Sequence, residues 1–184
     1  MALKVRRYDL RGTYRGQKAT YSGANTAGVS GASGGGIIAA LGASTTKTIR
    51  LQRVVFSATV ATAAIYVGLT LRKTSTLTSG GTAATLTQTP FVSTSAAGSA
   101  ALCNTYSAAP SAGTLVGTLI TQQVFLPLTG TPALGITPVV FDFANESEME
   151  TPTLVAGSTQ GLELVISSPG NVPTLAVTWI WTEE

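Results

Sequence analysis

The last apolar stretch of the chain, residues 175–181, most constrains what this sequence can fold into. It reads Leu-Ala-Val-Thr-Trp-Ile-Trp and holds both tryptophans of the chain. Because side chains alternate between the two faces of a strand, Leu175, Val177, Trp179 and Trp181 fall on one face. So much apolar surface is costly to leave in water. We therefore expect a strand in the middle of a sheet, and the earlier strands must supply the surface that it covers.

Shorter runs with turn signals between them predict the other strands. We expect strands at 48–57, 65–71, 121–128, 139–143, 154–155 and 162–166, and short strands at 85–88 and 91–94 stay open. In the strand at 48–57, strict alternation places Ile49 and Leu51 on one face and Val54 and Phe56 on the other. For the Ala-rich stretch 96–106, one or two helical turns are an open alternative. Seven or eight strands without an amphipathic helix predict an all-β fold, a β-sandwich of jelly-roll or related Greek-key type.

The first 46 residues differ in composition from the rest and are expected to form an extended arm. The first 18 hold six basic residues against one acid, Asp9, and residues 22–46 are mostly Gly, Ala, Ser and Thr. Such a composition buries too little apolar surface to offset the entropy of ordering it. We therefore divide the chain into an N-terminal arm at 1–46 and a β-sandwich domain at 47–184.

The charge of the chain is divided in the same way. Residues 1–50 carry eight Lys and Arg and one Asp, and residues 51–184 carry three Lys and Arg and seven acids, so the net +3 splits into +7 and −4. A basic segment seeks an acidic surface. Interleaved tyrosines raise nucleic acid as a partner, but the acidic domain favours a protein, and a solvated tail stays open. The residues expected to carry the contacts of the arm are Arg6, Arg7, Tyr8, Arg11, Tyr14, Arg15, Lys18 and Tyr21.

The residues that enzymes use most are scarce here, so we expect no catalytic, cofactor or metal site. The chain has no His, which is the commonest general base and metal ligand. Glu146, Glu148 and Glu150 are interpreted as a solvated acidic turn. A weak calcium site with Asp142, or a contact for the arm of a neighbouring copy, is the alternative. The single Cys103 is expected to pack as a small buried hydrophobe.

Four aromatic residues are expected to anchor the core or an interface: Phe56, Phe125, Trp179 and Trp181. An exposed tryptophan pair would instead favour a carbohydrate-binding module. No run of 18 strongly apolar residues occurs, so we expect no membrane span. The basic N-terminus also lacks the apolar run of a signal peptide.

The layout of the domain carries a resemblance. Residues 51–56 lead to a strand that ends in Arg72-Lys73-Thr74-Ser75-Thr76, followed by a small-residue stretch at 80–90 and an Ala/Ser/Thr-rich segment that reaches Ala109-Pro110. The strand at 161–164 and the final strand, which ends in Trp181-Thr182-Glu183-Glu184, complete the pattern. From Arg50 onward the chain resembles small virion proteins of tailed bacteriophages: capsid decoration (cement) proteins, head fibres and related components. The arm lies outside the resemblance.

The resemblance implies a decoration protein that binds the outer shell of a virion and is made in the host cytoplasm. Its partners would be the major capsid protein and its own copies, as a homotrimer. An arm of about 45 residues at roughly 3.3 Å each would reach neighbouring subunits, and linked contacts gain avidity. A head fibre, spike or tail-associated component is the first alternative, and a carbohydrate-binding module the second. No membrane partner is expected, and nucleic acid is disfavoured.

Overall fold

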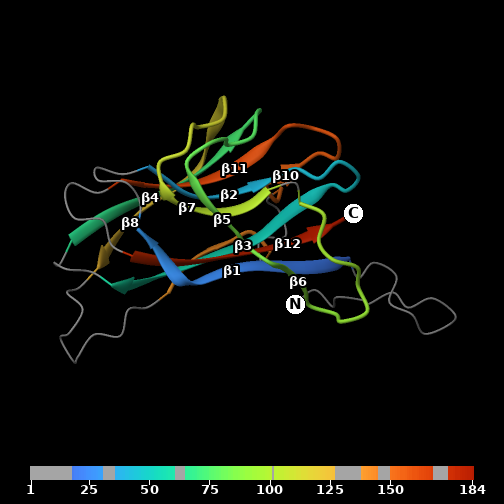
Figure 1. The fold of residues 1–184 in the computed structure, drawn as a ribbon, viewed down its shortest axis with the longest axis horizontal. Helices are drawn as coiled ribbons and strands as arrows, with labels where there is room; N and C mark the ends of the chain where they lie inside the picture. Colours follow the sequence, from blue (N-terminus) through green and yellow to red (C-terminus); the bar gives the residue numbers. More distant parts are fainter. Residues whose placement is uncertain are drawn as a thin grey trace, which may run out of the picture.

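The computed structural model describes residues 18–30, 36–60, 65–100, 102–126, 138–144, 150–167 and 174–184. Within these ranges all regular structure is strand, and twelve strands form two antiparallel sheets of six. The sheets pack face to face, with β12, β1 and β3 in one layer and β11, β2 and β4 in the other (Figure 1). The predicted all-β sandwich is confirmed; its jelly-roll type stays a prediction.

Each sheet mixes strands from distant parts of the chain. The first has the order β10-β3-β12-β1-β6, with β9 also beside β3, and the second has the order β5-β7-β2-β11-β4-β8. The first sheet contains β1 (Ala19–Ser30), β3 (Ile49–Val60), β6 (Gln88–Pro90), β9 (Val139–Asp142), β10 (Thr153–Leu154) and β12 (Thr174–Glu183). The second contains β2 (Gly36–Gly42), β4 (Ile65–Thr74), β5 (Thr82–Thr85), β7 (Leu102–Ala108), β8 (Leu115–Leu126) and β11 (Gly161–Ser167).

The C-terminal strand β12 lies in the middle of the first sheet, between β3 and β1, as predicted. Leu175, Val177, Trp179 and Trp181 are each at most 1% exposed, and the residues between them are half-buried. They join the inner side chains of the second sheet in one hydrophobic cluster. The period-two pattern therefore identified both the strand and the face that it buries.

A β-bulge explains why β3 buries residues on both sides of the predicted alternation. Ile180 of β12 pairs with Arg53, whereas the next residue, Trp181, pairs with Leu51. Gln52 is thus the extra residue, and beyond it the side chains change face. As a result Ile49, Leu51, Val54 and Phe56 all reach the core, which corrects the expected separation of the first two from the last two.

The predicted boundary of the arm is wrong, because residues 19–30 and 36–42 form two strands of the sandwich. β1 lies between β12 and β6, and β2 lies between β11 and β7. Ile38, Ala39 and Leu41 are fully buried. The small residues that looked like linker composition allow the sheets to approach closely. Of the predicted arm, residues 1–17 and 31–35 lie outside the described residues.

Two smaller predictions also differ from the structure. The stretch 96–106 has no helix in its described part, and its end belongs to β7, where Cys103 and Thr105 pair with Leu41 and Ala39 of β2 and are buried. Residues 91–94 form a bend and turn in place of a strand. Ala, Ser and Thr have weak local preferences, so the partner strand decides the conformation of these segments.

Candidate functional site

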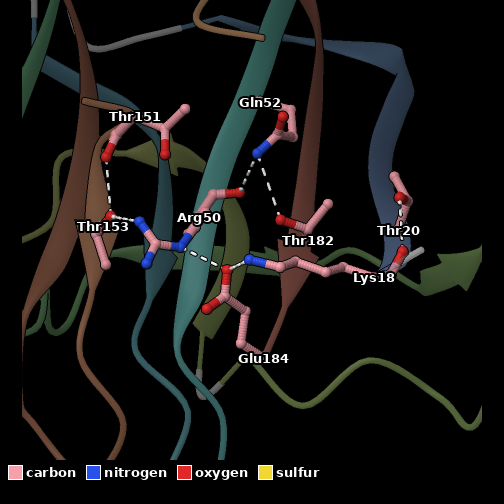
Figure 2. A network of polar contacts seen from close by, with 8 residues as sticks. All are labelled: Lys18, Thr20, Arg50, Gln52, Thr151, Thr153, Thr182 and Glu184. Atoms are coloured by element: carbon pink, nitrogen blue, oxygen red, sulfur yellow. Dashed lines mark hydrogen bonds and ion pairs between the residues drawn. The ribbon is translucent and has the colours of Figure 1, made fainter. Parts of the chain in front are cut away.

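The junction between the N-terminal segment and the sandwich is the most distinctive polar feature of the described chain (Figure 2). Lys18, just before β1, forms an ion pair with Glu184 through Nζ and Oε1. Arg50 Nε donates to the same oxygen at 2.6 Å, and Arg50 Nη1 donates to Thr153 Oγ1 at 3.3 Å. Lys18, predicted to contact a partner, is therefore paired within its own chain. Because these groups are partly exposed, the pairs contribute at most about 1 kcal/mol each.

More cations gather at the same end of the sandwich. Lys73 Nζ donates to the carbonyl of Thr153 at 2.8 Å, so Lys73 and Arg50 flank one residue. Lys47 is exposed and directly precedes Thr48, whose backbone exchanges hydrogen bonds with Glu184. Residues 1–17, which lead into this end, carry five Lys and Arg and one Asp, a net charge of +4. The junction is thus a basic end that suits an acidic surface.

Below the junction a buried cluster fixes the start of β1. Tyr21 is 4% exposed and stacks on Trp181, with ring centroids 6.0 Å apart. Glu183 accepts hydrogen bonds from Ser99 N and Oγ at 2.8 Å and from Trp181 Nε1 at 3.1 Å. Burial, and then the charge of Glu183, raise the pKa of Tyr21. Tyr21 was predicted to contact a partner through the arm; it belongs to the core instead, because it lies on β1.

A second buried carboxylate was missed by the sequence reasoning. Glu163 is 0% exposed and accepts hydrogen bonds from Arg72 Nε at 2.7 Å, Thr78 Oγ1 at 2.6 Å and Gly113 N at 2.8 Å. These contacts tie β11 to β4 and to two loops that bridge at Ser79 and Ser111. One charge within the apolar run Leu-Glu-Leu-Val was the available signal, since a buried charge requires partners.

Four of the described acids are held by basic or other hydrogen-bond donors. Asp142 pairs with Arg53, as Glu184 does with Arg50, and Glu163 and Glu183 lie among the donors given above. Carboxylate pairs that cleave glycosides must flank an accessible bond. Among the described residues no group of three or more His, Cys, Asp or Glu could hold a metal ion. Glu146 and Glu148, from the calcium alternative, lie outside these residues.

The thiol of Cys103 is built into the core. Its side chain is 1% exposed, and burial raises its pKa to about 12. A thiol with that pKa stays protonated at neutral pH and is a poor nucleophile and metal ligand. The residue packs between the sheets as a small hydrophobe, as expected.

The four predicted aromatic anchors divide into two groups. Phe56, Trp179 and Trp181 are at most 2% exposed, and Phe56 packs edge-on to Phe141 with centroids 5.1 Å apart. Phe125 is 48% exposed on β8 and contacts Tyr66 of β4. The buried tryptophans cannot stack on a sugar, which removes the observation that a carbohydrate-binding module required. The other predicted contact residues, Arg6, Arg7, Tyr8, Arg11, Tyr14 and Arg15, lie outside the described residues.

No family model, no curated protein and no solved structure matches this chain. In the described part of the chain, no helix is long and apolar enough to cross a bilayer. The surfaces of the sandwich are therefore the features that bear on its function. Those of interest are the basic end around Lys18 and the exposed edge of the second sheet around Phe125.

Proposed function

We propose that the chain is a structural protein of a phage particle, a decoration protein that binds the outer surface of the capsid and stabilises it. The observation that carries the proposal is the way in which the basic segment 1–17 joins the fold. It continues directly into β1, which lies inside the first sheet between β12 and β6. A partner that holds this segment is thereby linked to the core of the sandwich.

The pairing of β1 suits it to bear load. Its ladder with β12 runs from Ala19 opposite Glu183 to Ser30 opposite Thr174, with one irregularity between Asn25 and Val29. Hydrogen bonds between antiparallel strands are perpendicular to them. A pull along β1 therefore strains the ladder as a whole, whereas a pull across it would open one bond at a time. This geometry suits residues 1–17, together with β1, to act as a tether that holds the sandwich to a partner.

The reach of the tether follows from its corrected length. Seventeen extended residues span about 56 Å at roughly 3.3 Å each, which is shorter than a 46-residue arm and sufficient to cross part of a neighbouring subunit. Attraction between the basic end and an acidic shell is screened over about 8 Å at physiological ionic strength. Many such weak contacts, linked through a trimer, would gain avidity.

Co-sedimentation tests the proposal with the full chain and shells of the major capsid protein from the same phage. Replacing Arg6, Arg7, Arg11 and Arg15 by Ser should abolish most binding at physiological salt, and raised salt should release the unaltered chain. The control Lys47→Ser removes one charge from the same end outside the segment and should retain most binding. Undiminished binding by the fourfold variant would exclude the tether.

The position of the protein on the particle separates decoration from its runner-up. A fibre, spike or tail-associated component would use the same rooted segment as an anchor. Gold labelling of intact particles should place a decoration protein over the whole shell. Label confined to the tail or to one vertex would favour the runner-up, and absence of the protein from particles would overturn both.

A further inference from the structure

The edge strands of the two sheets differ sharply in length. In the described part of the chain, β5, β6, β9 and β10 span two to four residues each, whereas β8 spans 12. β8 pairs there with β4 alone and forms one margin of the second sheet, at the left in Figure 1. Short edges offer little to a foreign strand, but a long edge presents a row of unpaired backbone donors and acceptors.

β8 also lacks the side chains that usually protect an edge. Its sequence, Leu-Val-Gly-Thr-Leu-Ile-Thr-Gln-Gln-Val-Phe-Leu, contains no charged residue and no proline. Its two register shifts against β4 lie before Ile120, so residues 120–126 pair without interruption with residues 65–71. These seven positions of β4 are uncharged as well. Two copies could therefore approach along this edge without repulsion between like charges.

Exposed apolar side chains line the same edge. Val67, Leu69 and Leu71 point into the core, so Tyr66 of β4 and Phe125, its partner on β8, point outward. These two rings are 65% and 48% exposed, and Leu119 on β8 is 41% exposed. On the core side of β8, Ile120 and Val124 pack against the hydrophobic cluster but are only partly buried. An added strand would cover apolar surface on both faces.

We propose that β8 pairs antiparallel with β8 of a second copy of this chain, about a two-fold axis at Gln122. Opposed residues in a continuous sheet have their side chains on the same face. One residue of β8 must therefore stand opposite its own counterpart, with the axis between the two. An axis at Gln122 sets Ile120 opposite Val124 of the second copy and Gln122 opposite itself. An axis at Gln123 would set Val124 against Gln122 and Phe125 against Thr121. On the core side, the first register matches Ile120 with Val124 in both pairs, whereas the second sets each Val124 against a Gln122.

Such a contact closes on itself, because both copies use the same edge, that of β8. It joins subunits in pairs, or joins two trimers where trimers form through another surface. The proposal does not depend on the decoration function, and it is tested on the purified protein without shells. Failure of either proposal therefore leaves the other standing.

Disulfide trapping tests the register. Directly opposed residues in antiparallel strands have Cα atoms about 4.5–5.5 Å apart, a separation that a disulfide spans. The full chain with Gln122→Cys, oxidised by oxidised glutathione, should become a covalent dimer; Cys103 is buried and gives little background. The control Thr85→Cys, exposed on the opposite edge strand β5, should stay largely unlinked. Linking of Gln122→Cys no stronger than the control, or stronger linking by Gln123→Cys, would overturn this register.

Light scattering tests the contact itself. The unaltered chain and the control Thr85→Lys should show a mass that doubles with increasing concentration. Placing Lys at both Gln122 and Gln123 should halve the mass at high concentration, while the unfolding transition shows that the fold is kept. A mass that the double substitution leaves unchanged, or an unaltered chain that never associates, would overturn the proposal.

Discussion

Glycine 23 shows how single small residues set the spacing of the two sheets. Gly23 lies on β1 of the first sheet, and a Cβ added there would overlap Sγ of Cys103, which lies on β7 of the second sheet. The next nearest atoms, in Leu86 and Trp181, would lie at ordinary contact distances of 3.5 and 3.6 Å. The close contact between Gly23 and Cys103 therefore sets the local spacing of the two sheets.

This close contact predicts a compensating pair of substitutions. Gly23→Ala should destabilise the fold by about 1–3 kcal/mol because the core is overpacked. Cys103→Ala removes the overlapping sulfur, so the double variant should be more stable than the sum of the two single effects implies. Equilibrium unfolding in urea measures all four proteins. Strictly additive effects would show that another contact limits position 23.

The two tryptophans offer a matched comparison at the same scale. Both are 0% exposed, but Trp181 Nε1 donates to Glu183, whereas Trp179 Nε1 has no hydrogen-bond partner among the described residues. Both Trp→Phe substitutions leave a similar void. Trp181→Phe should therefore cost about 1–2 kcal/mol more than Trp179→Phe, which removes an unsatisfied buried donor. Equal costs in urea unfolding would mean that the bond to Glu183 contributes no net stability.

At the level of strands, the sequence predicted elements with strong local patterns and missed those defined by their partners. β12, β4 and β11 carry apolar alternation that needs no knowledge of the fold. β1 is built mostly from Gly, Ala, Ser and Thr, and β2 is a short apolar run between two glycines. Both become strands because β12 and β11, far along the chain, lie beside them. The bulge at Gln52 is likewise visible only in the register with β12.

The polar sites followed the same rule. Glu163 receives donors from residues 50–91 positions away, so no local spacing could identify its network. The position of Phe125 on a strand was predicted, but its exposure follows from its place on the outward face of the second sheet, opposite Tyr66 of β4. The predicted end of the arm at residue 46 is corrected by β1 and β2, whereas the basic residues before Lys18 lie outside the described residues and their role stays a prediction.

The place of β1 in the sheet gives a prediction for truncated chains. Removing residues 1–17 keeps Lys18 and every described contact, so the unfolding free energy should change by no more than about 0.5 kcal/mol. Removing residues 1–30 takes away β1 and uncovers Tyr21's partner Trp181, and this chain should fail to fold cooperatively. Hydrogen exchange of the full chain should show slow amides from Tyr21 to Asn25. Fast exchange there would contradict the pairing of β1 with β12.

At the scale of the molecule, the charged residues that the structure describes lie in one half of the sandwich. Lys18, Arg50, Arg72, Lys73 and Glu183 lie toward the junction, as the strand registers show. The described segments 54–60, 65–71, 120–126 and 174–179, which lie toward the other end, contain no charged residue. The basic half suits an acidic partner, and the uncharged half suits a second copy of itself. Under the two proposals, one sandwich would bind a capsid surface and a second copy of the chain at the same time.

The response of the whole molecule to pH follows from three buried groups. Burial raises the pKa of Cys103 from 9.0 to about 12. Burial, and then Glu183, raise the pKa of Tyr21; burial first, together with Glu163, raises that of Tyr106 against the opposing effect of a hydrogen bond with Asn104. Each group binds its proton more tightly when folded than when unfolded. Their contribution to stability is therefore complete below about pH 9 and is lost as the pH rises through the folded pKa values.

Stability should accordingly fall in alkali, with Cys103 alone contributing a slope of about 1.4 kcal/mol per pH unit between pH 9 and 12. Between pH 6 and 8 the curve should be nearly flat, since the chain contains no His. Urea unfolding at pH 7, 9, 10 and 11 measures the curve. Cys103→Ala removes one of the three groups, so its curve should fall less steeply above pH 9. An identical slope in that variant would mean that the folded thiol ionises as readily as the unfolded one, which its burial between the sheets opposes.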